Sequence, residues 1–231
     1  MKEIHSSRFK DALWFPKEEE YVLVGGAGGI GSWLTLLLAR AGFYPMVFDF
    51  DILEEHNLAG QLYSKEDAQA HTPKVVALKN LCNSFADTVI DAFEEKITRE
   101  TMSHYFVFSA FDNMQARKDL FEAWSEFVDN YEGDLEPIFI DGRLTAEQMQ
   151  IFCVRPEDRD KYRVHLFDDS EVEDAPCTLK QTSHAAAMIG SHMVGFFTNH
   201  YTNNMEGDRV RSVPFLWEYF IPINLLTESN E

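Results

Sequence analysis

Residues 21–61 read YVLVGGAGGIGSWLTLLLARAGFYPMVFDFDILEEHNLAGQ and combine several local patterns. Residues 21–24 are a short, apolar, β-branched run that stops at glycine, which is typical of a buried parallel strand. A helix is expected over about 29–40, and a second strand over 46–50 that ends among aspartates. Strand, glycine turn, helix, strand and acid in this order predict a nucleotide-binding βαβ unit.

Three glycines in this stretch, Gly26, Gly28 and Gly31, fit the pattern GxGxxG. The first permits a tight turn, the second lets the backbone approach a phosphate, and the third lets the helix pack on the strand. The helix would direct its first amide groups at that phosphate, and Asp49 would accept hydrogen bonds from ribose hydroxyls. The alternative is that the glycines only allow close packing, which leaves their register and the acid unexplained.

An extra glycine, Gly29, and the downstream segment DFDILEEHNLAGQ separate this turn from that of a dehydrogenase. Together with later motifs they resemble the ThiF/MoeB adenylyltransferase family, the bacterial relatives of ubiquitin-activating enzymes. That family has GxGGxGS, a strand ending Asp-x-Asp, then Asn-Leu-x-Arg-Gln, a Pro-Lys pair, and Asp-Asn with an arginine four residues on. The corresponding residues here are 26–32, 49–51, 57–61, 73–74, 112–113 and Arg117. The likeness runs to about residue 154 and continues more weakly near residue 177.

The resemblance implies a set of site residues. Those expected to bind ATP are Gly26, Gly28, Gly29, Gly31, Asp49, Asp51, Asn57, Gln61, Lys74, Asn113 and Arg117. Asp49 would hold the ribose, Asn57 and Lys74 would contact the phosphates, and Asp112 would bind Mg²⁺ or organise the attacking carboxylate. Such an attack brings anions together, so Lys74 and a metal would neutralise charge in the transition state. The alternatives are a solvated lysine at the start of a helix and an N-cap role for Asp112.

The chain departs from the family pattern at several points. Gly60 stands where the family has an arginine, which removes an expected phosphate contact. Relatives often donate an N-terminal arginine across a dimer; Arg8 is the candidate here, and a solvated arm residue is the alternative. Many relatives hold a structural zinc with two Cys-x-x-Cys pairs, but three cysteines, Cys82, Cys153 and Cys177, cannot supply four ligands within one chain.

Three further features invite a functional interpretation. Relatives that pass on the acyl group often use a cysteine before the long helix, so Cys177 is a candidate nucleophile, with an ordinary helix-boundary residue as the alternative. Arg143 suits a carboxylate or phosphate, or an ion pair with a nearby acid. His184 and His192 are expected in the core or an interface rather than on a metal.

The remaining segments alternate between strand and helix patterns. Strands are expected at 88–93, 105–110, 137–141, 149–154 and 213–226, and helices at 73–85, 113–128 and 180–202. This order predicts an α/β fold: a Rossmann-like, mostly parallel sheet with helices on both faces, a C-terminal helix and late antiparallel strands. Residues 155–176 are expected to form an exposed acidic crossover loop over the site, or else a disordered insertion. The late strand would bury Trp217 and Phe220.

Composition limits the number of domains, the classes of binding partner and the cellular compartment. The 231 residues are consistent with a single ThiF-like ATP-binding domain over 1–231. The net charge of −19 argues against broad nucleic-acid binding and against anionic membranes. Three cysteines argue against a disulfide framework, and neither a signal-peptide pattern nor a membrane-length apolar run is apparent, so we expect a cytoplasmic protein.

The resemblance therefore implies an ATP- and Mg²⁺-dependent adenylyltransferase. It would activate the C-terminal carboxylate of a small ubiquitin-like or sulfur-carrier protein, or of a peptide, as an acyl adenylate, and it would be a homodimer. Two alternatives stay open. One is a non-catalytic ATP-binding scaffold of the same fold, which Gly60 favours. The other is an NAD-dependent oxidoreductase.

Overall fold

The computed structural model describes residues 8–145, 147–167 and 182–230. Its centre is an eight-stranded sheet in the order β3-β2-β1-β4-β5-β6-β7-β8. The strands are β1 (Tyr21–Gly25), β2 (Tyr44–Phe48), β3 (Asp91–Phe93), β4 (Phe106–Ser109), β5 (Ile138–Thr145), β6 (Gln148–Val154), β7 (Leu216–Phe220) and β8 (Leu225–Ser229). Strands β1 to β5 pair in parallel, and β6 to β8 continue the sheet antiparallel. The predicted α/β class with late antiparallel strands is confirmed.

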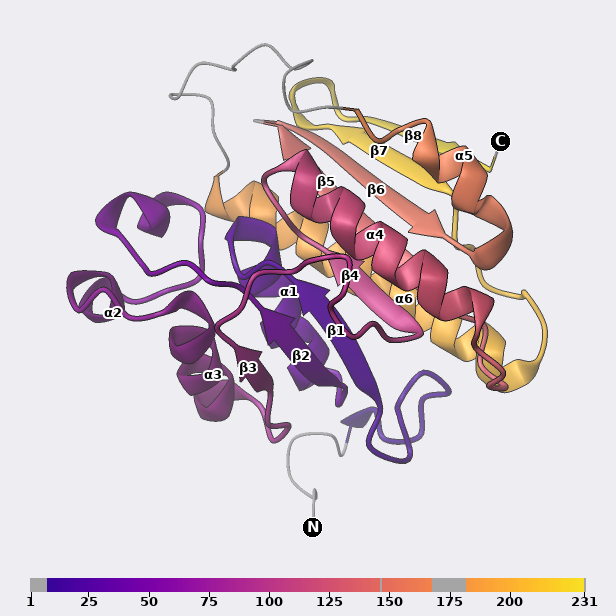
Figure 1. Ribbon diagram of the computed structural model, residues 1–231, viewed down its shortest axis with the longest axis horizontal. Coiled ribbons are helices and arrows are strands. Elements are labelled where there is room, and N and C mark those ends of the chain that lie inside the picture. The colour runs from indigo at the N-terminus through magenta and orange to yellow at the C-terminus, as the bar shows by residue number, and fades with distance from the viewer. Residues whose placement is uncertain (1–7, 146, 168–181, 231) are drawn as a thin grey trace.

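Helices cover both faces of this sheet. They are α1 (Gly29–Arg40), α2 (Lys65–Gln69), α3 (Lys74–Phe85), α4 (Met114–Asp129), α5 (Arg159–Arg163) and α6 (Ser183–Glu206), with short 3₁₀ turns at Glu55–Ala59, Pro156–Asp158 and Ile221–Ile223. Figure 1 shows α4 in front of the sheet and α6 behind it. None of the helices among the described residues is long and apolar enough to cross a membrane.

The core has two layers because the central strands are buried on both faces. In β1, Val22 and Val24 face the cluster under α1 and α6, whereas Leu23 faces the cluster under α4. Both cysteines in the described part of the chain, Cys82 and Cys153, are buried in the first cluster. The long helix α6 packs in this core too, through residues such as Ile189.

Two histidines of α6 are not in the core, one of the two places expected for them. His184 and His192 are exposed, so the interface alternative stays a prediction, and the ring of His192 lies on Trp217 with the two ring centroids 4.5 Å apart. Residues 213–226 are also not one strand. They form the β7–β8 hairpin, because Pro222 and the left-handed Asn224 break the extended run. As a result Trp217 is buried but Phe220 is only partly buried.

Two further segments differ from the sequence prediction. Strand β5 runs past residue 141 to Thr145 and forms a hairpin with β6, so Arg143 lies inside a strand opposite Gln150. The start of the acidic crossover is not irregular, because residues 156–163 form a 3₁₀ turn and α5. Tyr162 of α5 is fully buried among aromatic side chains. Residues 164–167 form a turn and an irregular segment, and residues 168–176 of that predicted loop lie outside the described residues.

Candidate functional site

The glycine turn lies at the carboxyl end of β1, between β2 and β4. Gly26 has φ = +94°, a conformation that side chains rarely adopt. A Cβ atom on Gly31 would lie 1.9 Å from the carbonyl oxygen of Gly26, so helix α1 approaches the turn too closely for any other residue. A Cβ atom on Gly28 would meet nothing within 4 Å, so the middle of the turn is open. The turn is therefore tight at Gly26, in close contact with helix α1 at Gly31, and open at Gly28, as expected from the glycine pattern.

Helix α1 begins directly at this turn without a side-chain cap. Gly28 is its N-cap residue, and the first turn holds no acidic side chain. The amide of Ser32 reaches the carbonyl oxygen of Gly28 at 3.0 Å, whereas amides earlier in the first turn have no place in the i→i−4 ladder. An uncapped helix start next to an open glycine turn favours an anionic ligand.

Asp49 follows the last residue of β2 and holds the turn from the side. Its Oδ2 accepts the Ala27 amide at 2.7 Å, and its Oδ1 accepts the Asp51 amide at 2.8 Å. Burial raises the pKa of the Asp49 carboxyl, and the charge of Lys74 works in the opposite direction. Each oxygen keeps a free lone pair, so the carboxylate can still accept a ribose hydroxyl.

Lys74 is the first residue of α3 and is buried beside this carboxyl edge. Its Nζ lies 2.7 Å from Oδ2 of Asp51, with 8% of the lysine side chain and 48% of the aspartate side chain exposed. Its backbone amide also donates to the Asp51 carbonyl at 2.9 Å, which fastens α3 to the segment after β2. The reading of Lys74 as a solvated lysine is therefore wrong.

The Asn-Leu-x-x-Gln segment lies next to this pair. Oδ1 of Asn57 accepts the Glu54 amide at 2.9 Å, which leaves its NH₂ group for a ligand. Oε1 of Gln61 is buried and has no partner in the described part of the chain. Gly60 is buried with φ = −125°, so the backbone does not require glycine at this position.

Asp112 lies just after β4. The Ala110 amide donates to the Gly25 carbonyl at 2.9 Å, so this chain end lies against the glycine turn. The N-cap of α4 is Asn113, whose Oδ1 accepts the Ala116 amide at 2.8 Å; an N-cap role for Asp112 is wrong, because the helix starts one residue later than predicted. Asp112 is exposed, and Asn113 is the neighbour that its carboxylate contacts among the described residues, at 3.4 Å.

Arg117 and Arg143 both bind Asp141 on β5. Their Nε atoms lie 2.6 and 2.7 Å from the two carboxylate oxygens, and the Tyr162 hydroxyl donates to Oδ2 at 2.8 Å. Burial alone would raise the pKa of the Asp141 carboxyl, but the two guanidinium groups outweigh it and the pKa is lowered. The ion pair is thus the alternative that the structure supports for Arg143. Arg117 also donates to the Phe111 carbonyl at 2.7 Å, immediately before Asp112.

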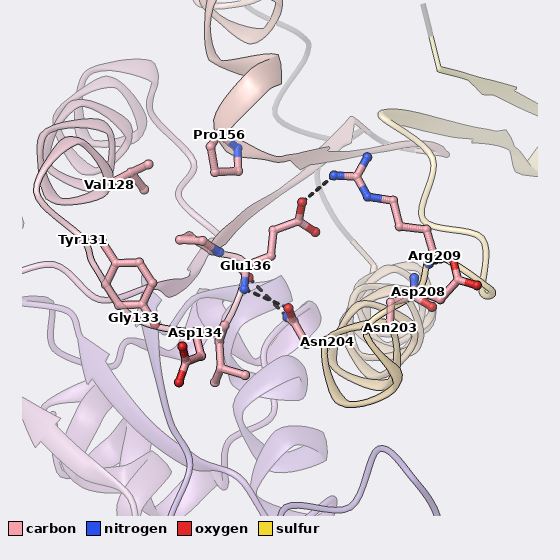
Figure 2. Close-up of a pocket in the computed structure, with 13 residues that line it drawn as sticks. Val128, Tyr131, Gly133, Asp134, Glu136, Pro156, Asn203, Asn204, Asp208 and Arg209 are labelled. Atoms are coloured by element: carbon pink, nitrogen blue, oxygen red, sulfur yellow. Dashed lines mark hydrogen bonds and ion pairs between the residues drawn. The ribbon is translucent and has the colours of Figure 1, made fainter.

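Two cavities lie at the opposite, amino-terminal edge of the parallel strands. One, of about 620 Å³, is formed by residues 131–137 and 203–209; Figure 2 shows Glu136 in it, bound to Arg209 and Asn204. The other, of about 570 Å³, is lined by Phe9, Trp14 and Phe15 among others. Neither of these two cavities includes the glycine turn or Lys74, which lie at the carboxyl edge.

The last predicted residues are the cysteines and Arg8. Cys177 lies outside the described residues, and Arg8 is exposed at their start. Both described cysteines are buried, and burial raises the pKa of the Cys82 thiol to about 12 and also raises that of Cys153, which disfavours the nucleophilic thiolate. Within the described ranges no three metal-ligating side chains come together. Sequence reasoning missed Tyr162, whose signal is a single aromatic residue in a charged stretch.

Comparisons with known proteins agree with this architecture. The adenylyltransferase and sulfurtransferase MOCS3 of Arabidopsis thaliana is 33% identical over 103 residues, covering 42% of this chain and only 22% of that protein. The crystal structure of selenomethionine PaaA has a TM-score of 0.66 at 16% identity and covers 98% of this chain and 76% of that one. Escherichia coli MccB, solved with ATP, has a TM-score of 0.68 at 13% identity, covering 94% and 65%. The sequence model of the ThiF family matches residues 17–222, nearly the whole chain, and the protein therefore belongs to the ThiF family.

Proposed function

We propose that the chain is an ATP-dependent adenylyltransferase that converts a C-terminal carboxylate into an acyl adenylate and releases pyrophosphate. The observation that carries this proposal is the buried ammonium group of Lys74 beside Asp49 and Asp51, at the carboxyl edge of the sheet. Family membership supports it, since one relative is named an adenylyltransferase and MccB is solved with ATP.

ATP fits the residues that are present. The open turn at Gly28 and the uncapped start of α1 would receive phosphate oxygens. Asp49 would accept ribose hydroxyls, and Asn57 would donate through its NH₂ group. The Lys74 ammonium group would contact a phosphate either in place of the Asp51 carboxylate or together with it. Because Asp51 is half exposed, water can solvate its carboxylate when the lysine turns to the phosphate.

In the reaction, an oxygen of the substrate carboxylate forms a bond to the α-phosphorus. The bond from that phosphorus to the bridging oxygen breaks, and pyrophosphate leaves with the electron pair. Anions meet in this step, so a fixed positive charge lowers the barrier more in a buried site than in water. Lys74 would supply that charge, because 8% exposure leaves its ammonium group little solvent screening.

Asp112 fits a magnesium ion carried by the nucleotide. Its carboxylate is exposed and is not used as a helix cap. Mg²⁺ is usually bound by one or two carboxylates together with substrate phosphates, which suits a single acid without a three-ligand cluster. When bound, the ion would neutralise phosphate charge. Arg117 would act through the Phe111 carbonyl that it holds, placing Asp112 rather than touching ATP itself.

The partner would be a small ubiquitin-like or sulfur-carrier protein, or a peptide, with a free C-terminal carboxylate. MccB, which shares the fold, is solved with the peptide MccA. We further propose a homodimer in which Arg8 reaches the phosphates of the ATP bound by the partner subunit. We also propose that the Cys177 thiol attacks the acyl carbon of the adenylate, so that a thioester forms and AMP leaves. Analytical sedimentation of the full chain tests the dimer. Intact-mass analysis of wild type and Cys177→Ala, after incubation with ATP and carrier, tests the transfer.

ATP–pyrophosphate exchange tests the proposal. Carriers and peptides with free C-termini would be assayed with wild type, Lys74→Ala and the exposed-lysine control Lys65→Ala. Exchange by wild type and Lys65→Ala, but not by Lys74→Ala, is expected. ATP binding without exchange for any carboxylate would favour the second candidate, an ATP-binding scaffold. The glycine at position 60, where the family has an arginine, supports that candidate.

A further inference from the structure

Tyr63 touches the glycine turn from a distant part of the chain. Its hydroxyl donates to the carbonyl oxygen of Ala27 at 2.6 Å, across 36 residues of sequence. On the other side of the same residue, the Ala27 amide donates to Asp49 at 2.7 Å, across 22 residues. The peptide groups before and after Ala27 are therefore each fixed by one side chain.

This arrangement determines where the next amide points. A trans peptide group is planar, so its C=O and N–H bonds point in opposite directions. Because the Ala27 carbonyl is directed at Tyr63, the Gly28 amide is directed away from Tyr63. That amide has no acceptor among the described residues, and the turn is open at Gly28.

Tyr63 is itself firmly held. Ser32 Oγ accepts the Leu62 amide at 3.0 Å, which ties the segment before Tyr63 to helix α1. The Tyr63 ring packs against the small buried cluster that includes Leu53 and Ala68. Burial raises the pKa of the Tyr63 phenol well above 10, so the hydroxyl keeps its proton and remains a donor.

We propose that Tyr63 is a positioning residue that aims the Gly28 amide at a phosphate of ATP. The inference rests on the proposed nucleotide site and adds to it a residue outside the glycine and aspartate motifs. Tyr63 does not contact the nucleotide; it acts through the Ala27–Gly28 peptide group. Without its hydroxyl, that peptide group can rotate, and the phosphate loses an oriented donor.

The Tyr63→Phe variant removes one oxygen and keeps the ring. Calorimetry would compare its binding of ATP and of adenosine, which has no phosphate, with the wild type. We expect the Kd for ATP to rise about tenfold, as for one lost hydrogen bond to a charged group, and the Kd for adenosine to stay unchanged. The matched control is Tyr219→Phe on β7, away from the site. It loses a 2.6 Å hydrogen bond to Oδ1 of Asn224 and should bind both ligands normally.

The outcomes separate this inference from the proposed function. Wild type that binds neither ATP nor adenosine contradicts the nucleotide site itself. Suppose instead that the wild type binds ATP. If Tyr63→Phe then binds ATP equally well, or if its affinities for ATP and adenosine fall to the same extent, only the role of Tyr63 is overturned. Amide hydrogen exchange on the wild type gives a readout that does not depend on the variant folding: ATP should slow exchange at Gly28, and no slowing would contradict the proposal.

Discussion

The Nζ atom of Lys74 lies 2.7 Å from Oδ2 of Asp51, and the lysine is the buried partner while the aspartate is half exposed. Water therefore screens the acid much more than the base. The Lys74 ammonium group is thus held at the sheet edge by an acid that is itself not buried. A phosphate could therefore contact Lys74 without displacing a buried carboxylate.

Replacing Lys74 with alanine should abolish ATP binding and lower exchange activity by about 100-fold or more, the range found when a preorganised transition-state charge partner is removed. Lys65→Ala, on the exposed surface of α2, should retain both. Calorimetry and exchange kinetics measure the two effects. Normal ATP binding by a folded Lys74→Ala protein would remove this lysine from the site.

Asp112→Asn should strongly lower the exchange rate while leaving the unfolding temperature unchanged, because the side chain is exposed and does not cap α4. Asp11→Asn removes an equally exposed charge near the N-terminus and serves as the control. In a kinetic titration, the residual exchange of the Asp112 variant should need a higher Mg²⁺ concentration for half-maximal rate than the control does. Full activity of Asp112→Asn would refute its assigned role.

Asp141→Asn should cost about 3–5 kcal/mol of unfolding free energy, since it leaves Arg117 and Arg143 buried without their counter-charge. Asp129→Asn breaks a more exposed pair with Arg159 and should cost less than about 1 kcal/mol. Urea unfolding compares the two. Similar small losses for both variants would mean that the Asp141 pairs contribute little.

His200 predicts a loss of stability in mild acid. Burial lowers its pKa from 6.5 to about 4 in the folded protein, where Glu136, Glu157, Arg155 and Arg209 surround it. The neutral form is thus favoured by folding, so its contribution is complete above pH 6.5 and is lost as the pH falls towards 4. His200→Gln should flatten the dependence of unfolding free energy on pH over this window. An unchanged slope would show that other groups dominate it.

Several parts of the site were predictable because their signals are local. The glycine turn, Asp49 and Lys74 each follow a recognisable strand or helix boundary, and the structure places all three at one sheet edge. Arg143 was open to two interpretations. Its neighbour two residues back on the same strand, Asp141, favours the ion pair, since alternate residues of a strand share a face.

Other features depend on contacts that sequence spacing does not reveal. Tyr63 binds Ala27 across 36 residues, and no local pattern distinguishes it from other tyrosines. Tyr162 is buried because α5 packs it against Phe121 and Phe139, although its neighbours in sequence are charged. The β7–β8 hairpin was missed because its turn at residues 221–224 contains three apolar residues, so the apolar run looks continuous.

The most direct test of adenylation follows one oxygen atom. A carrier or peptide labelled with ¹⁸O in its C-terminal carboxylate would be incubated with the full chain, ATP, Mg²⁺ and hydroxylamine, and the released AMP would be analysed by mass spectrometry. Attack of the carboxylate on the α-phosphorus, followed by cleavage at the acyl carbon, predicts AMP that carries one ¹⁸O atom. Unlabelled AMP, or ADP with phosphate as the products, would contradict the account.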